Sequence, residues 1–535
     1  MKNQIHVIPK PVKIESNSNS FLLTNDTKIV FTKDIEPLGE CLILLLKSAT
    51  NYSLQKKKVE NGKDIKTENN AICLSLNDSY KKMGPEGYFL EVTEDKISIS
   101  SISANGVFYG IQTLRQLLPP EIESQIKSDN IIWQVPCVKI TDYPKFLWRG
   151  FMLDESRHFF GSEIVKKLLD LMALLKMNKF HWGLTNDQGW RIEIKKYPKL
   201  TEIGSVRQAS QIGGFASPFR KRDPHGGFYT QQEIKEIIEY AKQRFIQIIP
   251  EIDMPGHISS AIAAYPELSC REERIDVPYT FGIKKDILCV GKEKVFDFAK
   301  DVLREVIELF PSDIIHIGGD EVPKSRWKNC PKCQRRIRDE GLANEQELQV
   351  YFTNRIIKFL DEHGKTAIGW NEFLGDNLLE TAIGQYWMKD FDAVMQHLRR
   401  GRKFIMSKFA KTYLDYNHGV TSLKTVYNYN PIPKNLEADY HENILGIEAP
   451  LWTEWVASKN HLERLTFPRL IAIAEANWTM KDKKSFEEFK IRLASFLKRL
   501  DFLDVHYAPL WIADPNIFVK LIGYISFFLG TFDIF

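Results

Sequence analysis

The sequence predicts an α/β protein in which a (β/α)8 TIM barrel follows a small α+β domain. Two features of the chain lead to this prediction. From Lys145 onward, short apolar runs alternate with long amphipathic segments, a pattern typical of repeated βα units around a parallel sheet. Eight apolar runs can be counted, which is the number of strands in such a barrel. Before that point, shorter runs alternate between apolar and polar residues and favour a separate sheet domain.

The eight apolar runs of the expected barrel are separated by helical segments. Helices are expected, for example, in SEIVKKLLDLMALLKM after the first run and in QQEIKEIIEYAKQRF before the third, because apolar residues recur there at helical spacing. The runs are FLWRGFML, KFHWGLTN, QIIPEIDM, DIIHIGGD, TAIGWNE, AIGQYWM, KFIMSKF and ILGIEAPLW, which begin at Phe146, Lys179, Gln247, Asp313, Thr366, Ala382, Lys403 and Ile444.

We expect three segments along the chain. Residues 1–142 form the α+β domain, with strands in the alternating stretch 88–102, a helix over 106–118 and a solvated loop at Asn61–Asn70. Residues 143–515 form the barrel. Residues 516–535 are an apolar tail whose run from Leu521 to Phe532 is shorter than the roughly 20 residues of a membrane span.

Charge and the first residues bear on partners and location. The 73 basic and 69 acidic residues leave a net charge of +4, and the lysines are spread along the chain. This balance argues against a nucleic-acid partner, which would favour a basic stripe. The start MKNQIHVIPKPVKI has no apolar core of a secretory signal, so we expect none in this chain and, by default, a cytoplasmic location.

The seven cysteines do not have the spacing of a disulfide framework. Cys330 and Cys333 form one CxxC motif, and a zinc site would need two more ligands. Because the sequence offers no second CxxC and no nearby pair of histidines, we expect free thiols or a local disulfide. We expect neither a metal nor a cofactor.

Polar motifs stand where four of the expected strands end. The fourth strand ends in HIGGDE, where Asp320 and Glu321 follow two glycines that let the backbone approach a ligand. The first, third and eighth strands end in DESRHFF, EIDMPGH and EAPLWTEW. The carboxyl ends of barrel strands carry active sites, so Arg157, His257 and Glu454 are expected on the same rim as the acid pair. Core packing alone would not require this arrangement.

Several long motifs resemble the β-N-acetylhexosaminidases of glycoside hydrolase family 20. They are RGFMLDESRHFF, LTNDQGWR, IPEIDMPGH, HIGGDEV, GWNE, YLDY and EAPLWTEW, and they occur in family order from the N-terminal domain to about residue 515. The resemblance implies an exo-acting, retaining hydrolase of terminal β-linked GlcNAc or GalNAc, with a glycan or amino-sugar oligosaccharide as substrate. Family members are often secreted or lysosomal.

The resemblance also implies a mechanism that depends on the substrate. The 2-acetamido group attacks the anomeric carbon and forms an oxazolinium intermediate, an exception to the scheme with two enzyme carboxylates. Glu321 would act as general acid and then base, and Asp320 would hold the acetamide N–H.

The resemblance further assigns sugar contacts. Arg157 would donate to ring hydroxyls and Glu454 would accept from them. Tyr413 would donate to the acetamide oxygen, with Asp415 beside it. The pocket walls would be Trp370, Trp387 and Trp452, giving the apolar enclosure with a few polar groups that suits a closed sugar site.

The second expected strand departs from the family pattern at two positions. Gly183 replaces a histidine, and Asn186 replaces the first of two acids. In the family this first acid pairs with the histidine of PGH, here His257. If Asn186 faces His257, it cannot stabilise a charged imidazole, so His257 would stay neutral to lower pH. Asp187, the next residue, could compensate.

Two other classes of protein would need different residues at the strand ends. A metal-dependent barrel hydrolase would need a pair of histidines or a cluster of histidines and acids at the strand ends, and Gly183 breaks the one candidate pair. A sugar-binding homologue without catalysis would keep the tryptophans and Arg157 but lose the acid pair. Because Asp320 and Glu321 are both present, Asn186 is the only support for that alternative. The sequence does not distinguish GlcNAc from GalNAc and does not indicate an oligomeric state.

Overall fold

The computed structural model describes residues 5–60, 67–215 and 217–528. The chain divides into two compact units, each built from separate stretches. The first contains the chain up to Leu147 together with Leu171–Met177 and Ile471–Tyr507, and the second contains the rest. The contiguous boundaries expected at residues 142 and 515 stay a prediction. The loop expected at Asn61–Asn70 lies largely outside the described residues.

A seven-stranded mixed sheet forms the body of the first unit, in the order β1-β7-β5-β6-β4-β2-β3. The predicted alternation corresponds to β5 and β6, whose residues are alternately buried and partly exposed. Helix α2 (Ala104–Leu117) begins where the Ser103 side chain accepts a hydrogen bond from Gly106 N–H. The other elements are α1 (Glu36–Thr50), β1 (Lys13–Leu22), β2 (Lys28–Thr32), β3 (Gln55–Val59), β4 (Ala71–Leu76), β5 (Tyr88–Val92), β6 (Lys96–Ser101) and β7 (Gln134–Asp142).

The first unit also contains helix α15 (Phe486–Phe502), from much later in the chain. Arg492 on this helix donates from both terminal nitrogens to the two carboxylate oxygens of Glu475, each at 2.6 Å, and also to the Val7 carbonyl. Arg499, further along the helix, contacts Glu123 at 3.1 Å. All four of these charged side chains are buried, so each ion pair replaces hydration that the groups lose on folding.

A closed barrel of eight parallel strands forms the second unit, as the sequence predicts. The sheet runs β9-β15-β16-β17-β18-β19-β20-β8, and β8 pairs again with β9 to close it; the two-residue β10 (Gly189–Trp190) adds antiparallel to β9. The strands are β8 (Trp148–Asp154), β9 (Lys179–Asn186), β15 (Gln247–Ile252), β16 (Ile314–His316), β17 (Thr366–Trp370), β18 (Ile383–Tyr386), β19 (Phe404–Met406) and β20 (Ile444–Leu451).

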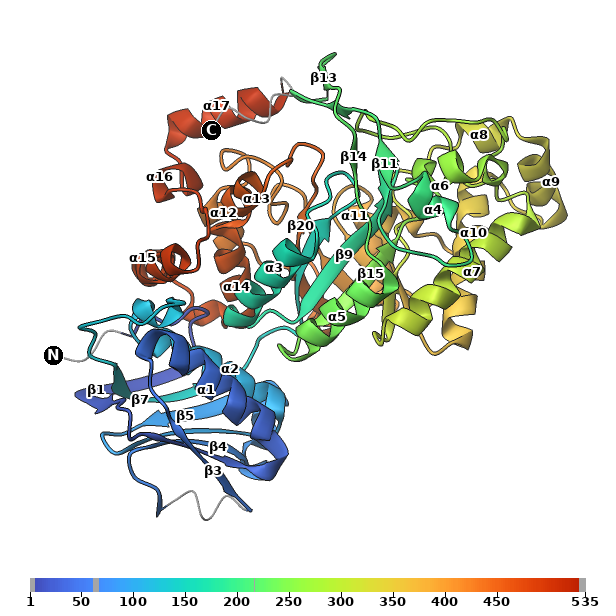
Figure 1. Ribbon diagram of the computed structural model, residues 1–535. Coiled ribbons are helices and arrows are strands. Elements are labelled where there is room, and N and C mark those ends of the chain that lie inside the picture. Colours follow the sequence, from blue (N-terminus) through green and yellow to red (C-terminus); the bar gives the residue numbers. More distant parts are fainter. Residues whose placement is uncertain (1–4, 61–66, 216, 529–535) are drawn as a thin grey trace. The chain divides into compact units, whose positions relative to one another are not determined.

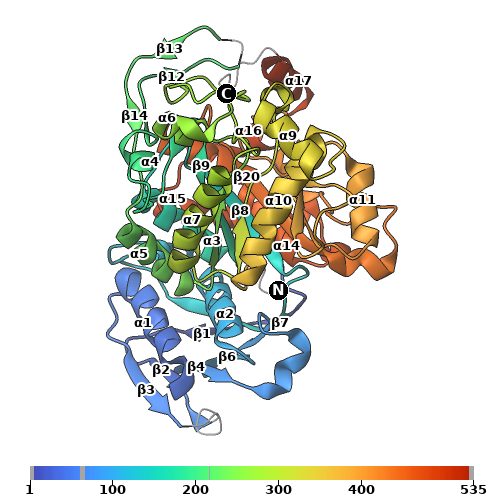
Figure 2. The same ribbon diagram turned by 90° about the vertical axis from the view of Figure 1, so that its right-hand side faces the viewer.

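Amphipathic helices surround the strands of the barrel (Figures 1 and 2). Helix α5 begins with a capping box, in which Thr230 and Glu233 each accept a hydrogen bond from the other's backbone N–H. The main outer helices are α3 (Ser162–Leu174), α5 (Gln231–Lys242), α7 (Glu293–Leu309), α10 (Glu345–Glu362) and α11 (Phe391–Arg399). Helix α14 (Arg469–Trp478) is buried along its whole length, and most of it belongs to the first unit.

Shorter elements lie in the barrel's loops and at its end. The helices are α4 (Lys199–Glu202), α6 (Ser259–Ala264), α8 (Ser325–Lys328), α9 (Pro331–Asp339), α12 (Leu423–Tyr427), α13 (Lys459–Thr466), α16 (Leu510–Ala513) and α17 (Ile517–Phe528). Two small hairpin sheets pair β11 (Val206–Arg207) with β14 (His225–Gly226) and β12 (Ser210–Gln211) with β13 (Arg220–Lys221). The expected apolar tail corresponds to α17, and its last residues lie outside the described part. Within that part, no helix has the length and apolarity that crossing a membrane requires.

Charged side chains lie buried inside the barrel, beneath the carboxyl ends of the strands. His181 Nδ1 lies 2.7 Å from Glu448 Oε1, and its Nε2 lies 3.3 Å from Glu251 Oε2. Burial lowers the pKa of His181, but the two carboxylates outweigh it and raise that pKa to about 10. His181 is therefore a cation between two anions. Glu251 also accepts a 2.9 Å hydrogen bond from the indole of Trp370.

The buried pair Arg492–Glu475 generates a prediction about stability. Glu475→Gln removes the buried carboxylate that pairs with Arg492, and we expect the free energy of unfolding to fall by about 3–5 kcal/mol. The matched control is Glu487→Gln, which breaks the exposed pair with Lys490 on the same helix and should cost under about 0.5 kcal/mol. Urea titration followed by circular dichroism measures both, and equal effects of the two changes would contradict the prediction.

Candidate functional site

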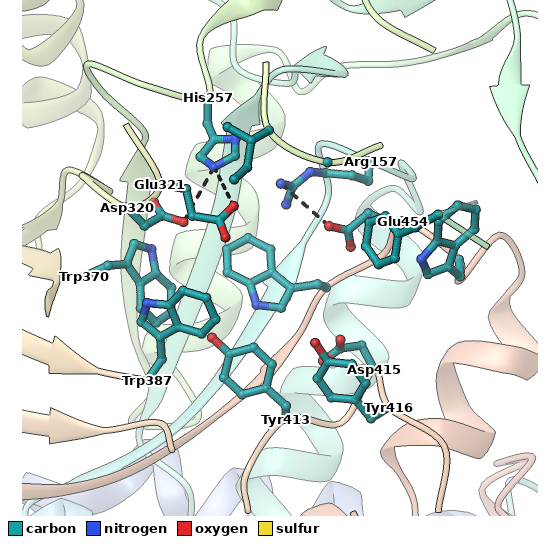
Figure 3. A pocket seen from close by; sticks show the side chains of 15 residues that line it. Arg157, His257, Asp320, Glu321, Trp370, Trp387, Tyr413, Asp415, Tyr416 and Glu454 are labelled. Carbon is teal, nitrogen blue, oxygen red and sulfur yellow. Dashed lines mark ion pairs between the residues drawn. The ribbon is translucent and has the colours of Figure 1, made fainter. Parts of the chain in front are cut away.

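One pocket lies at the carboxyl ends of the barrel strands, with a volume of about 400 Å³ (Figure 3). This size falls in the usual range of small-molecule sites. Residues from the ends of β8, β16, β17, β18 and β20 meet there with residues of loops. The lining comprises Arg157, Phe215, His257, Gly282, Ile283, Asp320, Glu321, Trp370, Trp387, Tyr413, Asp415, Tyr416, Trp452, Glu454 and Trp455. Ten of the twelve residues predicted for the site are in this set, and Asn186 and Asp187 lie behind it.

Arg157 is held on one side of the pocket by contacts from three segments. Its Nη1 lies 3.2 Å from Asp154 Oδ2, its Nε donates to Gln188 Oε1 at 3.1 Å, and its Nη2 lies 3.8 Å from Glu454 Oε1. The guanidinium also lies 4.9 Å from the ring centroid of Trp452. Because these contacts leave the two terminal nitrogens on the pocket side, Arg157 and Glu454 present a donor and an acceptor together (Figure 3).

The acid pair follows a sharp turn after β16. Gly318 and Gly319 have φ of 65° and 93°, and a Cβ on Gly318 would lie 1.8 Å from Asp253 Oδ1. Only glycine fits Gly318 without moving that carboxylate. Glu321 itself has φ of 48°, an uncommon conformation for a residue with a side chain. The turn places Asp320 and Glu321 on the same side of the pocket, both facing His257 (Figure 3).

His257 connects the acid pair to a buried carboxylate. Its Nδ1 lies 2.9 Å from Asp187 Oδ2, while its Nε2 lies 3.5 Å from Glu321 Oε2 and 3.8 Å from Asp320 Oδ2. Asp187 also accepts hydrogen bonds from the N–H and hydroxyl of Ser259. Burial lowers the pKa of His257, but the hydrogen bond to Asp187 and the charge of Asp320 raise it well above its ordinary value. His257 is therefore charged at neutral pH.

Asn186 does not face His257, so the neutral imidazole that would follow from such a contact does not apply, and Asp187 takes the place that the sequence left open to it. Asn186 Nδ2 donates to Asp253 Oδ2 at 3.3 Å, and Asp187 is the residue that points at His257. Adjacent residues at the end of a strand point in opposite directions, so a shift of one position changes the partner. At the other departure, a Cβ on Gly183 would lie 3.0 Å from Met152 Cε, so a histidine there would crowd the barrel interior.

The two acids have different electrostatic surroundings. Burial raises the pKa of Asp320 to about 6, although the charge of His257 opposes this. Burial also raises the pKa of Glu321, but its hydrogen bond to His257 and the charge of His257 outweigh burial and lower it. Asp320 Oδ1 is buried and has no hydrogen-bond partner among the described residues, and the same holds for Asp415 Oδ1. The pocket therefore presents two unused acceptors.

Aromatic side chains form a further wall of the pocket. The indole of Trp387 donates to both oxygens of Glu372, at 2.8 and 3.0 Å, and the Trp387 ring stacks on Tyr413 at 6.0 Å between centroids. Trp370 and Trp452 contact each other at 5.6 Å between centroids. Burial, followed by the charge of Asp320, raises the pKa of Glu372 to about 8. The wall consists of aromatic rings, and hydrogen bonds to Glu251 and Glu372 fix the indoles of Trp370 and Trp387.

Sequence reasoning missed several residues of the site. Asp253 and Glu372 stand inside the recognised motifs EIDMPGH and GWNE. Each is an acid just after the end of an apolar strand, and this position could have identified both. Phe215, Ile283, Tyr416 and Trp455 line the outer part of the pocket from loops. Loops lack a period that predicts which side chains point inward, so the sequence gives no signal for the first three.

Three groups among the described residues bring together side chains of the types that bind metals. His181, Glu251 and His316 form one, inside the barrel, and Asp253, His257 and Asp320 form another, behind the pocket. In both, an anion already faces a histidine, as in the pairs of Glu251 with His181 and Asp320 with His257. The third group consists of four cysteines and lies outside the pocket lining.

The sequence matches two domain descriptions. "Glycosyl hydrolase family 20, catalytic domain" matches residues 146–481, and "Glycosyl hydrolase family 20, domain 2" matches residues 4–143. The chain is 41% identical to a beta-hexosaminidase of Porphyromonas gingivalis over 94% of its own length, and it spans 64% of that relative's length. It is 35% identical to a beta-hexosaminidase of Vibrio furnissii, covering 88% of this chain and 76% of the relative.

A solved structure is similar over nearly the whole chain. It is an exo beta-N-acetylglucosaminidase of Vibrio harveyi in complex with N-acetylglucosamine. The TM-score is 0.81 at 31% identity, and the match covers 94% of this chain and 78% of that one. The likeness therefore includes both compact units.

The pairing of His257 with Asp187 generates a prediction about pH. Asp187→Asn removes the anion that keeps the imidazole charged, so we expect the pKa of His257 to fall. The stability that the charged imidazole contributes is present at low pH and is lost as pH rises through its folded pKa. The loss should therefore begin at lower pH in the variant.

Histidine NMR titration, with His257→Gln to assign the resonance, measures the shift. The matched control is Asp439→Asn, at an exposed position outside the pocket. Identical titrations of His257 in the wild type and in Asp187→Asn would contradict the assigned partner. A carboxylate at position 186 would face Asp253 instead.

Proposed function

Because the chain belongs to glycosyl hydrolase family 20, we propose that it is an exo-acting, retaining β-N-acetylhexosaminidase that hydrolyses terminal, non-reducing β-linked GlcNAc or GalNAc. The observation that carries the proposal is the acid pair, in which the buried Asp320 Oδ1 has no partner among the described residues and stands beside the partly exposed Glu321. A buried acceptor without a donor costs free energy unless a ligand supplies one. An acetamide N–H of a bound sugar is such a donor.

The sugar hydroxyls are proposed to bind at the polar side of the pocket. Arg157 donates to ring hydroxyls, and Glu454, 3.8 Å from it, accepts from them. Asp415 offers a second buried acceptor. The flat faces of Trp370 and Trp452 cover the apolar face of the ring, as aromatic walls do in closed sites. Substrates with a free non-reducing end fit such a pocket.

The acetamide group is proposed to act as the nucleophile. Asp320 accepts its N–H, and Tyr413 donates to its carbonyl oxygen, with the methyl group against Trp387 and Trp370. So oriented, the carbonyl oxygen forms a bond to the anomeric carbon as the glycosidic bond breaks, which gives an oxazolinium ion. The negative charge of Asp320 stabilises the positive charge that develops on the nitrogen.

Glu321 is proposed to move the protons. It donates a proton to the glycosidic oxygen as the aglycone leaves, then accepts one from the water that opens the oxazolinium ion with net retention. In the free site, His257 keeps the pKa of Glu321 low. The Glu321 side chain is 35% exposed, so a bound sugar can bury it further, which raises its pKa and favours the protonated acid.

The contact of His257 with Asp187 also bears on the alternative of a sugar-binding homologue without catalysis. Its only support was the amide at position 186, and that amide faces Asp253. The discriminating experiment is turnover of 4-nitrophenyl β-GlcNAc, with the β-glucoside as control. Hydrolysis of the first alone supports a requirement for the acetamide, and hydrolysis of neither would refute the enzyme proposal. Rates on GlcNAc, GalNAc and chitobiose substrates define the specificity.

A first variant tests the role of Glu321. Glu321→Gln cannot donate a proton, and we expect kcat/KM on chitobiose to fall by roughly 10²–10⁴-fold. The loss should be smaller for an aryl glycoside with a good leaving group, which needs less protonation. Steady-state kinetics on both substrates measure this, with Glu487→Gln as the control. Near-normal turnover of chitobiose by Glu321→Gln would remove Glu321 from the role.

An inhibitor tests the nucleophile. A thiazoline analogue of GlcNAc mimics the cyclised intermediate, so it should inhibit competitively and bind at least about 10²-fold more tightly than GlcNAc. Calorimetric titration of both ligands measures the ratio, and Asp320→Asn should reduce it. If the thiazoline binds no better than the free sugar, a nucleophile on the enzyme becomes the better account.

A further inference from the structure

Four cysteines from distant parts of the sequence gather at one place beside the barrel. Cys330 precedes helix α9 and Cys333 lies in its first turn. Cys270 and Cys289 come from the two ends of a long loop, where an antiparallel bridge between Ser269 and Leu288 brings the chain back on itself. Three of the four thiols are buried, and Cys270 is partly exposed.

The distances between the sulfur atoms fit a metal ion. Cys289 Sγ lies 3.6 Å from Cys330 Sγ and 3.7 Å from Cys333 Sγ, and Cys270 Sγ lies 3.8 Å from Cys333 Sγ. All four lie within 4.8 Å of one another. Zinc–sulfur bonds of about 2.3 Å in a tetrahedron set the sulfur atoms about 3.8 Å apart. A disulfide would need about 2.05 Å.

We propose that Cys270, Cys289, Cys330 and Cys333 bind one Zn²⁺ ion in a structural tetrathiolate site. Four protein ligands complete the tetrahedral coordination and leave no position for a substrate, which is the mark of a structural site. The two ligands that the CxxC motif needs in addition are close to it in the fold but not in the sequence. Cys270 and Cys289 are separated by 18 residues, and Cys289 and Cys330 by 40. The spacing of the cysteines alone led us to expect free thiols or a local disulfide, because it does not show which segments the fold brings together.

Nearby charges suit a cluster of anionic thiolates. Lys332 stands between Cys330 and Cys333 in the chain, and Lys292 donates to the carbonyl of Ser269, next to Cys270. Both lysines also contact Glu272, at 2.7 and 2.9 Å. In addition, the amino end of α9 carries the positive end of the helix dipole. A zinc ion with four thiolates carries a net charge of −2, and the two lysines together with Glu272 contribute +1, which offsets part of it.

The backbone is also built for close contact at this point. A Cβ on Gly291 would lie 2.3 Å from the carbonyl carbon of Lys332 and 2.5 Å from the backbone nitrogen of Cys333. The turn after Cys289 and the CxxC turn therefore touch through their main chains, which only glycine allows. The indole of Trp327 donates to the Leu288 carbonyl at 2.8 Å and ties the same two segments.

The zinc ion would close a loop that reaches the pocket. Residues 271–288 lie between two of the ligands, and Gly282 and Ile283 of this loop line the pocket. The other two ligands follow Glu321 by nine and twelve residues. The site therefore joins the base of a pocket loop to the segment after the acid pair. It acts on structure, and its existence does not depend on the proposed hydrolase activity.

The test begins with metal content and coordination in the wild-type chain. The protein, purified without a metal-affinity tag or chelator from cells grown with zinc, should contain about one zinc per chain by elemental mass spectrometry. X-ray absorption should give four sulfur ligands at about 2.3 Å. A mercurial reagent should release the zinc to a coloured chelator. Alkylation under denaturing, non-reducing conditions detects disulfides, and the elemental analysis detects iron or the absence of metal. Two disulfides, four metal-free thiols or bound iron would each overturn the proposal.

Variants assign the ligands. Cys289→Ser and Cys333→Ser should each lose most of the zinc, and Cys270→Ser, at the partly exposed position, provides a ligand change less disruptive to packing. The matched control is Cys41→Ser, which should keep about one zinc per chain. Wild-type protein stripped of zinc should be cut by trypsin within 271–288, which contains Arg271, Arg274, Lys284 and Lys285, and added Zn²⁺ should restore resistance. Zinc retained in all three ligand variants would overturn the assignment.

Discussion

Two carboxylates buried inside the barrel, Glu251 on β15 and Glu448 on β20, hold the floor of the pocket. Between them His181 supplies one positive charge from β9, and Trp370 on β17 is fixed by its hydrogen bond to Glu251. Burying two anions costs several kcal/mol each unless partners surround them, so the interior admits few arrangements. The position of Trp370 in the wall of the pocket therefore depends on the charged groups buried beneath it.

The rim of the pocket depends on the same principle, with carboxylates that do not line the pocket. Asp154 joins the ends of β8 and β20, because it contacts Arg157 and accepts hydrogen bonds from Thr453. Asp253 accepts from the N–H of Gly319 and so fixes the turn that carries the acid pair. Side chains that would meet a substrate are thus oriented by acids that would not.

The sequence was sufficient for the barrel and for most of the pocket, because strands and outer helices have periods that can be counted and because polar motifs follow the strands. It was insufficient where the direction of a side chain depends on a shift of one residue. Asn186 and Asp187 are neighbours at the end of β9, and only the structure shows which of them faces His257. Loop residues such as Phe215 and Ile283 have no period at all. The grouping of the four cysteines was not predicted for a third reason. The fold brings their segments together, and spacing along the chain does not indicate this.

The division of the first compact unit has a consequence for synthesis. Its sheet leaves the ribosome before the barrel strands, but α15, with Arg492 and Arg499, leaves after them. At roughly 5–20 residues per second, tens of seconds pass between the two. During that time Glu123 has Arg115 beside it but lacks Arg499, which also contacts it in the finished protein. The first unit is therefore completed only after every strand of the barrel has been translated.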